Sequence, residues 1–200
     1  SVTIPDSVTT IGKSAFFGCK RLTSVKIGNS VTSIGEEAFF GCSLMSVEIP
    51  DSVASIGNNA FQCCARLTSV VLPNGIEVIP WYSFSECSAL TSVVMTDSVK
   101  TIEEGAFCAD PLVEVVIPDS VTVIEEYAFV GCENLVAVTL SQNIERIEER
   151  AFAGCSSLSD VYYGKGEEDR ANITIGDSND PLLNATWHYN SINPKDHYSA

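Results

Sequence analysis

Residues 4–26 read IPDSVTTIGKSAFFGCKRLTSVK, and residues 27–48 repeat the pattern as IGNSVTSIGEEAFFGCSLMSVE. Five further copies begin at Ile49, Leu72, Met95, Ile117 and Leu140, so that copies of 22 or 23 residues cover positions 4–162. A repeat this short cannot bury its own apolar face, and neighbouring copies must stack to build a continuous core. Each 22-residue copy lacks one residue in the loop after the phenylalanine, which indicates a surface turn there.

Three apolar columns identify the core, because one Phe, one Leu and one Ile recur in every copy. They are Phe16, Phe39, Phe61, Phe84, Phe107, Phe129 and Phe152; Leu22, Leu44, Leu67, Leu90, Leu112, Leu135 and Leu158; and Ile11, Ile34, Ile56, Ile79, Ile102, Ile124 and Ile147. The segment LTSVKI at 22–27 fits the Leu-x-x-Leu-x-Leu strand pattern. Alternation then puts Ser24 and Lys26 on an open, solvent-facing side. Pro-Asp-Ser or Gly-Asn-Ser turns the chain, and a compact turn or single helical coil is expected around Phe16.

The repeat IPxSVTxIGxxAFxGCxxLTSV, nearly gapless in the first and third copies, resembles the BspA-like leucine-rich repeats. We therefore expect an α/β repeat solenoid, a right-handed leucine-rich-repeat superhelix that is strand-rich with short helical turns. Strands stacked ~4.8 Å apart would make it roughly 35 Å long. The resemblance implies a bacterial cell-surface or secreted protein whose repeats recognise proteins, host extracellular matrix among them.

The expected organisation has four parts. Residues 1–3 match the end of a truncated preceding repeat, residues 4–162 hold about seven repeats, residues 163–190 form a C-terminal capping segment, and residues 191–200 are a tail or linker. A cap must cover the last open core surface, for which Leu182, Leu183, Trp187 and Tyr189 are the candidates. The open N-terminal coil exposes a core end, which could promote a dimer.

Acidic residues outnumber basic ones by 26 to 11, giving a formal charge of −15. Nucleic-acid binding needs clustered Lys and Arg, so we expect no nucleic-acid partner. An anionic membrane surface would also repel such an acidic chain. No apolar run approaches the ~18 residues that cross a bilayer, so we expect no membrane insertion by this segment. Solubility is the simpler interpretation of the charge, and a cationic partner or divalent metal is the alternative.

The cysteine spacing favours packing over disulfides. Six of the eight share one repeat column, Cys19, Cys42, Cys64, Cys87, Cys132 and Cys155, with Ala109 or Asp110 near that position in the fifth copy. A column that follows a buried Phe predicts buried free thiols, since cysteine packs as a small hydrophobe. Disulfides between coils remain open if the Cβ atoms come within about 4 Å. Cys63 and Cys108 lie outside the column, and either could be exposed.

Catalysis has little support in the sequence. His188 and His197 are the only histidines, both near the C-terminus and without an evident nucleophile partner; His188 fits the surface or edge of the cap. There is no phosphate-binding glycine loop, no Gly-x-Ser-x-Gly elbow and no His-Glu-x-x-His pair. We expect no enzymatic activity and no cofactor.

Three features are candidate binding sites. The first is the open, concave face, where one column reads Lys26, Glu48, Val71, Val94, Val116, Thr139 and Tyr162, and its neighbour reads Ser24, Ser46, Ser69, Ser92, Glu114, Ala137 and Asp160. Three consecutive valines on an exposed face suggest a contact patch, although valine also simply favours strands.

The second feature is a glutamate column, Glu103, Glu104, Glu125, Glu126, Glu148 and Glu149, which is a weak calcium candidate. A solvated loop face is the simpler interpretation. The third is Trp81-Tyr82 after Pro80, which could be a loop contact or could fill space beside the proline. We predict a protein-binding or adhesion module; a structural spacer and a carbohydrate-binding module are the alternatives, and the latter would need Trp81, Tyr82 and Tyr162 to cluster.

Overall fold

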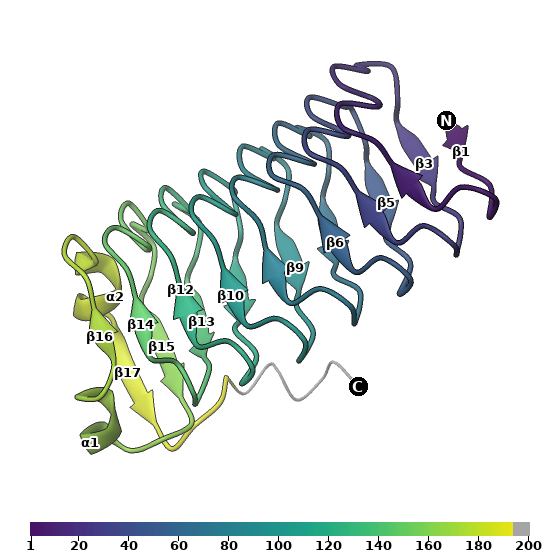
Figure 1. Cartoon of the computed structure of the whole chain (residues 1–200). Helices are drawn as coiled ribbons and strands as arrows, with labels where there is room; N and C mark the ends of the chain where they lie inside the picture. The colour runs from purple at the N-terminus through teal and green to yellow at the C-terminus, as the bar shows by residue number, and fades with distance from the viewer. Residues whose placement is uncertain (194–200) are drawn as a thin grey trace.

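The computed structural model describes residues 1–193, and in it the chain forms a solenoid of about eight stacked turns (Figure 1). Each turn contributes a longer strand to one column and a shorter strand to a second column. Strands that pair within a column are parallel, with equivalent residues of neighbouring repeats side by side. The expected strand-rich repeat solenoid is confirmed.

The column of longer strands begins with the two-residue β1 (Val2–Thr3) and continues with β3 (Ser24–Lys26), β5 (Ser46–Glu48), β7 (Ser69–Val71), β9 (Ser92–Val94), β11 (Glu114–Val116), β13 (Ala137–Leu140), β15 (Asp160–Tyr163) and β17 (Thr186–Tyr189). The shorter strands are β2 (Thr10–Ile11), β4 (Ser33–Ile34), β6 (Ser55–Ile56), β8 (Val78–Ile79), β10 (Thr101–Ile102), β12 (Val123–Ile124), β14 (Arg146–Ile147) and β16 (Thr174–Ile175). Two short helices, α1 (Glu167–Arg170) and α2 (Asp180–Asn184), lie near the C-terminal end.

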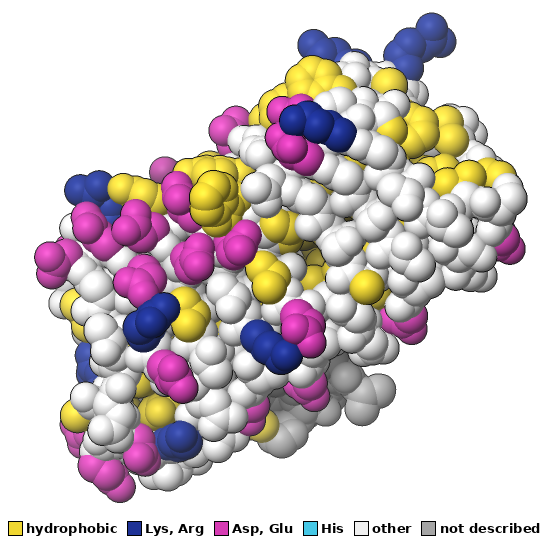
Figure 2. All heavy atoms as spheres, in the orientation of Figure 1, with side chains coloured by type: hydrophobic (Ala, Val, Ile, Leu, Met, Phe, Trp, Pro, Cys, Tyr) yellow, Lys and Arg dark blue, Asp and Glu magenta, His cyan; other side chains and the backbone are white. Residues whose placement is uncertain are grey.

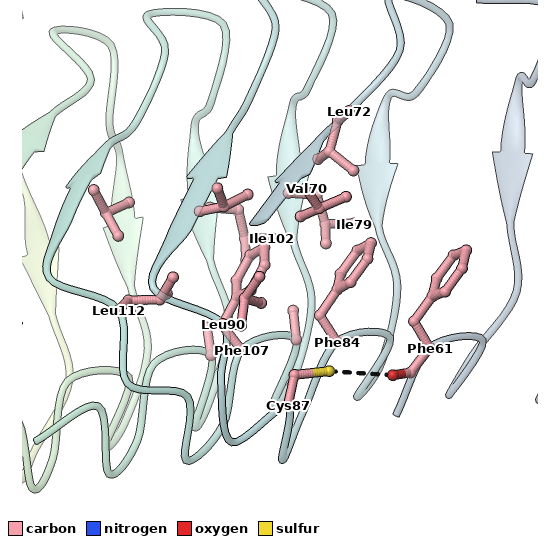
Figure 3. Packing of buried hydrophobic residues seen from close by; sticks show 14 of the residues in the cluster. Phe61, Val70, Leu72, Ile79, Phe84, Cys87, Leu90, Ile102, Phe107 and Leu112 are labelled. Atoms are coloured by element: carbon pink, nitrogen blue, oxygen red, sulfur yellow. Dashed lines mark hydrogen bonds between the residues drawn. The ribbon is translucent and has the colours of Figure 1, made fainter. Parts of the chain in front are cut away.

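A ladder of stacked phenylalanine rings runs through the core. Successive rings of the Phe column have centroids 5.1 to 5.6 Å apart and planes within 13° of parallel. Six of the seven rings are fully buried, while Phe16 in the first coil is half-buried. Figure 3 shows Phe61, Phe84 and Phe107 side by side, with Ile79 and Ile102 above them and Leu90 beside Phe107. Each ring therefore covers the next, and the core depends on stacking between coils.

Of the two forms expected around each Phe, the structure has the compact turn and not the single helical coil. The residue two positions before each Phe has a positive φ of 50° to 62°, at Ser14, Glu37, Asn59, Tyr82, Gly105, Tyr127 and Arg150. A left-handed residue cannot continue a right-handed helix, so the chain reverses there. In most coils its N–H donates to a carbonyl of the next coil, as from Ser14 to Glu36 at 2.8 Å. Hydrogen bonds between coils thus replace those within a helix, and the helices are confined to α1 and α2 in residues 1–193.

Pro80 interrupts the second strand column. In the other coils the residue at this position donates its N–H to the isoleucine carbonyl of the preceding coil, as from Gly57 to Ile34 and from Glu103 to Ile79. Pro80 has no N–H, so the carbonyl of Ile56 receives no such bond. Accordingly β6 and β8 do not pair, and the short strands divide into β2-β4-β6 and β8-β10-β12-β14-β16.

We call the junction between the coil of β5–β6 and the coil of β7–β8 the seam. Two more contacts between coils are missing there. The strands β5 and β7 are not paired either, as is also the case for β9 and β11 at another junction. At two other junctions a turn serine donates its hydroxyl across the coils, from Ser52 to Val31 at 2.7 Å and from Ser98 to Ile76 at 2.9 Å, whereas the equivalent Ser120 hydroxyl has no partner within residues 1–193. Gly75 occupies that position at the seam and has no hydroxyl. The Phe turn still crosses the seam, where Phe61 donates to Ser83 at 2.8 Å.

The C-terminal segment covers the last repeat with strands of its own. β16 pairs with β14 and β17 pairs with β15, while Leu182 is buried and Trp187 and Tyr189 pack half-buried against the core. Leu183, a candidate for the same role, is instead exposed. The fully buried Asn179 amide takes the place of a further coil: its Oδ1 accepts the N–H of Phe152, whereas the N–H of each earlier Phe donates to an alanine carbonyl of the next coil, or at the seam to that of Ser83. The tail expected over 191–200 lies mostly outside the described residues.

The cysteine column is buried and reduced, with one exception. Cys42, Cys64, Cys87, Cys132 and Cys155 are buried, and all eight cysteines are free. Each of the five donates its thiol to the carbonyl of a Phe in the preceding coil, at 3.1 to 3.3 Å, as Figure 3 shows for Cys87 and Phe61. Burial raises the pKa of Cys42 to about 11 and those of Cys64 and Cys155 to about 12. Cys19 is exposed because no coil covers that side of the first repeat, and Cys63 and Cys108 are half-buried.

Asp110 replaces cysteine in the fifth coil and is almost fully buried. Its Oδ1 accepts the N–H of Cys87 at 2.8 Å, whereas its Oδ2 has no hydrogen-bond partner within residues 1–193. Burial raises the pKa of Asp110 to about 9. The side chain is therefore a neutral carboxylic acid at pH 7.

Candidate binding surface

The open face is the solvent-facing side of the longer strands. Among its candidate residues, Lys26 and Glu48 are exposed, Tyr162 is half-buried and Thr139 is buried. The neighbouring column changes in the same way: Ser24, Ser46, Ser69 and Ser92 are exposed, Glu114 and Asp160 are half-buried, and Ala137 is buried. The accessible part of the open face therefore lies over β3 to β11.

Three valines in the middle of this face form what we call the apolar stripe. The side chains of Val71, Val94 and Val116 are 59%, 50% and 44% exposed. Val71 and Val94 are register partners in β7 and β9, and β11 lies beside β9. The valines that precede them in each strand, such as Val70 and Val93, point into the core. An uninterrupted apolar row, with Ser69 and Ser92 beside its first two valines, provides a surface that a partner could cover.

At its C-terminal end the open face carries an aromatic and ionic cluster. The rings of Tyr162 and His188 stack with centroids 4.6 Å apart, and Nε2 of His188 lies 2.7 Å from Oδ1 of Asp160. The Ser159 hydroxyl donates to the other oxygen of Asp160 at 2.6 Å. These hydrogen bonds from Ser159 and His188 lower the pKa of Asp160.

The order of contacts in this cluster is unsuited to nucleophilic catalysis. An activated serine must give its proton to the imidazole, whereas Ser159 and His188 both contact the carboxylate of Asp160. We interpret the cluster as the closing contact between β15 and the cap strand β17, whose register pairs Tyr162 with His188.

A groove of about 1120 Å³ lies at the N-terminal end of the open face. Residues 24–29, 46–52 and 71–73 line it, so it follows the ends of β3, β5 and β7 into their turns. Asp6, at its edge, accepts the backbone N–H of Asn29 at 2.7 Å, and Asp51 accepts that of Asn74 at 3.2 Å. We call this hollow the N-terminal groove.

Trp81 and Tyr82 lie in the turn after β8. Trp81 is 48% exposed, and its backbone N–H donates to the Glu103 carboxylate at 3.2 Å. The Tyr82 ring lies against Gly105, where a Cβ atom would come within 2.3 Å of the ring, and its hydroxyl donates to Glu104 at 2.8 Å. Burial and then this hydrogen bond raise the pKa of Tyr82 to about 12. Tyr82 therefore fills space over the neighbouring coil, and Trp81 is the accessible member of the pair.

The glutamate column belongs to the same side of the molecule, where acidic side chains gather over the C-terminal half (Figure 2). Glu148 pairs with Arg146 and Glu149 with Arg150, and the Glu125 carboxylate accepts the backbone N–H of Glu104. In residues 1–193, no three His, Cys, Asp or Glu side chains are grouped to hold a metal ion. The geometry of these residues therefore gives the weak calcium interpretation no support, and arginines and backbone N–H groups contact several of the carboxylates.

The sequence pattern locates the apolar stripe by alternation alone, but it misses two features. The groove depends on how neighbouring coils separate, and a single repeat gives no sign of that. The position of His188 depends on the register of β17 with β15, where the repeat has ended. The departure of residues 72–82 from the consensus, with Gly75 and Pro80, was the available signal for the seam.

The comparisons with known proteins agree with this architecture. Residues 1–111 and 100–172 match the family described as BspA type leucine rich repeat region, in six copies. A Treponema pallidum leucine-rich repeat protein is similar in structure, with a TM-score of 0.69, 28% identity, and coverage of 77% of this chain and 73% of that one. A Bacteroides ovatus leucine-rich repeat protein gives a TM-score of 0.63 at 27% identity, over 94% of this chain and 56% of that one. No curated protein matches the chain.

Neither helix within residues 1–193 is long enough or apolar enough to cross a bilayer.

Proposed function

We propose that this chain, which belongs to the BspA-type leucine-rich-repeat family, is a binding module that holds a protein partner on its open face. The observation that carries the proposal is the apolar stripe of Val71, Val94 and Val116, each at least 44% exposed. Burying a valine side chain is worth about 1.5 kcal/mol or more, so covering three of them provides a useful share of a binding energy. The small side chains of Ser69 and Ser92, beside Val71 and Val94, let a partner approach closely.

We further propose that the chain belongs to a cell-surface or secreted bacterial protein and that its partner is a host extracellular-matrix protein, so that the module serves adhesion. This proposal rests on the family resemblance rather than on a particular side chain. A dimer through the open N-terminal coil belongs to the proposal as well, because Phe16 and Leu22 line a hollow of about 550 Å³ at that end.

The alternatives have less support. A carbohydrate-binding module would need clustered aromatics, yet Trp81 and Tyr82 follow a strand of the second column while Tyr162 belongs to the first. A plain spacer would need no apolar row on its surface. Either alternative predicts that the valines of the stripe are dispensable.

The test is binding of the folded chain to immobilised collagen, fibronectin and laminin, compared with a variant in which Val71, Val94 and Val116 are each changed to Ser. A matched control carries Val78→Ser and Val123→Ser in the second strand column. We expect the stripe variant to lose binding and the control to keep it, with unchanged circular dichroism for both. Absence of binding by the parent chain at micromolar concentration would count against adhesion and favour the spacer.

A further inference from the structure

The N-terminal groove has the features of a peptide site. It spans the ends of three strands, or roughly 10 Å along the solenoid, which matches about three residues of an extended chain. Its lining combines apolar Pro50, Pro73 and Val71 with charged Lys26 and Glu48 and the hydroxyl of Ser46. Val71 has the largest exposed fraction among the exposed large hydrophobic side chains of residues 1–193.

Backbone groups beside this groove lack a hydrogen bond that several other coils form. In the neighbouring coil the N–H of Leu72 donates to the Val94 carbonyl at 2.9 Å. The equivalent bonds, from Ile27 to Glu48 and from Ile49 to Val71, are not formed among the described residues. All four residues line the groove, so donors and acceptors of the main chain lie where an extended ligand would run.

The charges of the groove favour a cationic ligand. Asp6, Glu48 and Asp51 provide three carboxylates against the single ammonium group of Lys26. Lys26 and Glu48 are register partners in β3 and β5, yet they form no ion pair in the part of the chain that the structure describes. Glu48 is exposed and also lacks a side-chain hydrogen bond there. Its carboxylate is therefore available to a Lys or Arg of a partner.

Other ligand classes fit less well. A saccharide is usually held against aromatic rings, and no aromatic residue lines the groove. An anionic ligand would meet the acidic excess of the groove and the net charge of −15. We propose that the N-terminal groove binds an extended segment of a partner protein that carries Lys or Arg beside an apolar residue, with the cation at Glu48 and the apolar side chain on Val71. This inference rests on the proposed binding role of the open face and adds to it the location and the chemistry of the ligand.

The test is fluorescence anisotropy with a labelled peptide of sequence Ala-Lys-Val-Lys-Ala, acetylated and amidated, beside a counterpart with Glu in place of Lys. Glu48→Gln removes one charge from the groove without removing a hydrogen bond. The matched control, Glu126→Gln, removes one charge from an exposed glutamate outside it.

We expect Glu48→Gln and Val71→Ser each to weaken binding of the lysine peptide by about three- to tenfold, the effect of one charge-assisted contact or one buried side chain. Glu126→Gln should change it by less than about twofold, since exposed distant charges are screened. The proposal would be overturned if Glu48→Gln and Glu126→Gln weakened binding of the lysine peptide equally. It would also be overturned if the glutamate peptide bound as tightly as the lysine peptide, or if the lysine peptide showed no saturable binding. If it is overturned while the stripe variant still loses its protein partner, the proposed function stands without the groove.

Discussion

Pro80 stands opposite the Ile56 carbonyl, and within residues 1–193 this is the one junction at which the isoleucine carbonyl of a coil receives no N–H from the next coil. Because Gly75 and the unpaired strands β5 and β7 lie at the same junction, the seam has fewer hydrogen bonds than its neighbours. Stability in a stacked-repeat protein is approximately the sum of coil and interface contributions. The seam is therefore where we expect the solenoid to open most readily.

Pro80→Ala should strengthen the seam, because it restores an N–H that can donate to Ile56. We expect slower amide hydrogen exchange in β6 and β8 by a factor of about two to ten, the effect of one net hydrogen bond. Pro118→Ala changes a proline in another turn and should leave exchange at the seam unchanged. Unchanged exchange in Pro80→Ala would show that the missing N–H does not limit opening there.

Removing one ring from the phenylalanine ladder should be costly. Phe107→Ala deletes a fully buried ring stacked on both neighbours, and we expect a loss of about 3 to 5 kcal/mol in the free energy of unfolding. Phe17→Ala is the control: Phe17 also stacks on a ring of the next coil but is half exposed, and should cost below about 1 kcal/mol. Urea unfolding measures the free energy of unfolding of both variants. Similar decreases for the two variants would contradict the claim that the buried ring ladder stabilises the fold.

Asp110 should make stability depend on pH. Its folded pKa is about 9, against 3.8 for an ordinary aspartate. Between those values the folded chain keeps a proton that the unfolded chain releases, so this residue lowers stability as pH rises, by at most about 1.4 kcal/mol per pH unit. Asp110→Asn cannot ionise and still offers an oxygen to the N–H of Cys87. The free energy of unfolding, measured with urea, should fall more between about pH 6 and pH 8 for the parent chain than for Asp110→Asn. Equal decreases for the two chains would mean that Asp110 is already ionised.

The reactivity of the thiols should follow their burial. Iodoacetamide added to the native chain should label Cys19 first and Cys63 and Cys108 more slowly, because thiolates react and burial raises the pKa of the latter two. The five buried members of the column should be labelled only after denaturation. Peptide mass spectrometry identifies the sites, and either labelling of Cys64 in the native state or a disulfide among the column would refute the packing interpretation.

The repeat pattern predicted the stacked coils, the apolar columns and the outward position of the stripe, because each follows from periodicity. It did not predict the left-handed residue in every Phe turn, which six of seven copies fill with a residue other than glycine. Nor did it predict that the Asn179 side chain would accept the N–H of Phe152, since the repeat ends before Asn179. Pro80 was visible in the sequence, but its effect required knowing that this position donates to Ile56.

The central claim is that a partner covers the apolar stripe, and site-specific photo-crosslinking tests it most directly. A photoreactive amino acid placed at position 94, on the open face, is compared with the same group at position 78, in the second strand column; both native valines are at least 40% exposed. With a matrix protein that binds the parent chain, the account predicts crosslinking from position 94 and little from position 78. Crosslinking from position 78 alone would contradict it and move recognition to the opposite side of the solenoid.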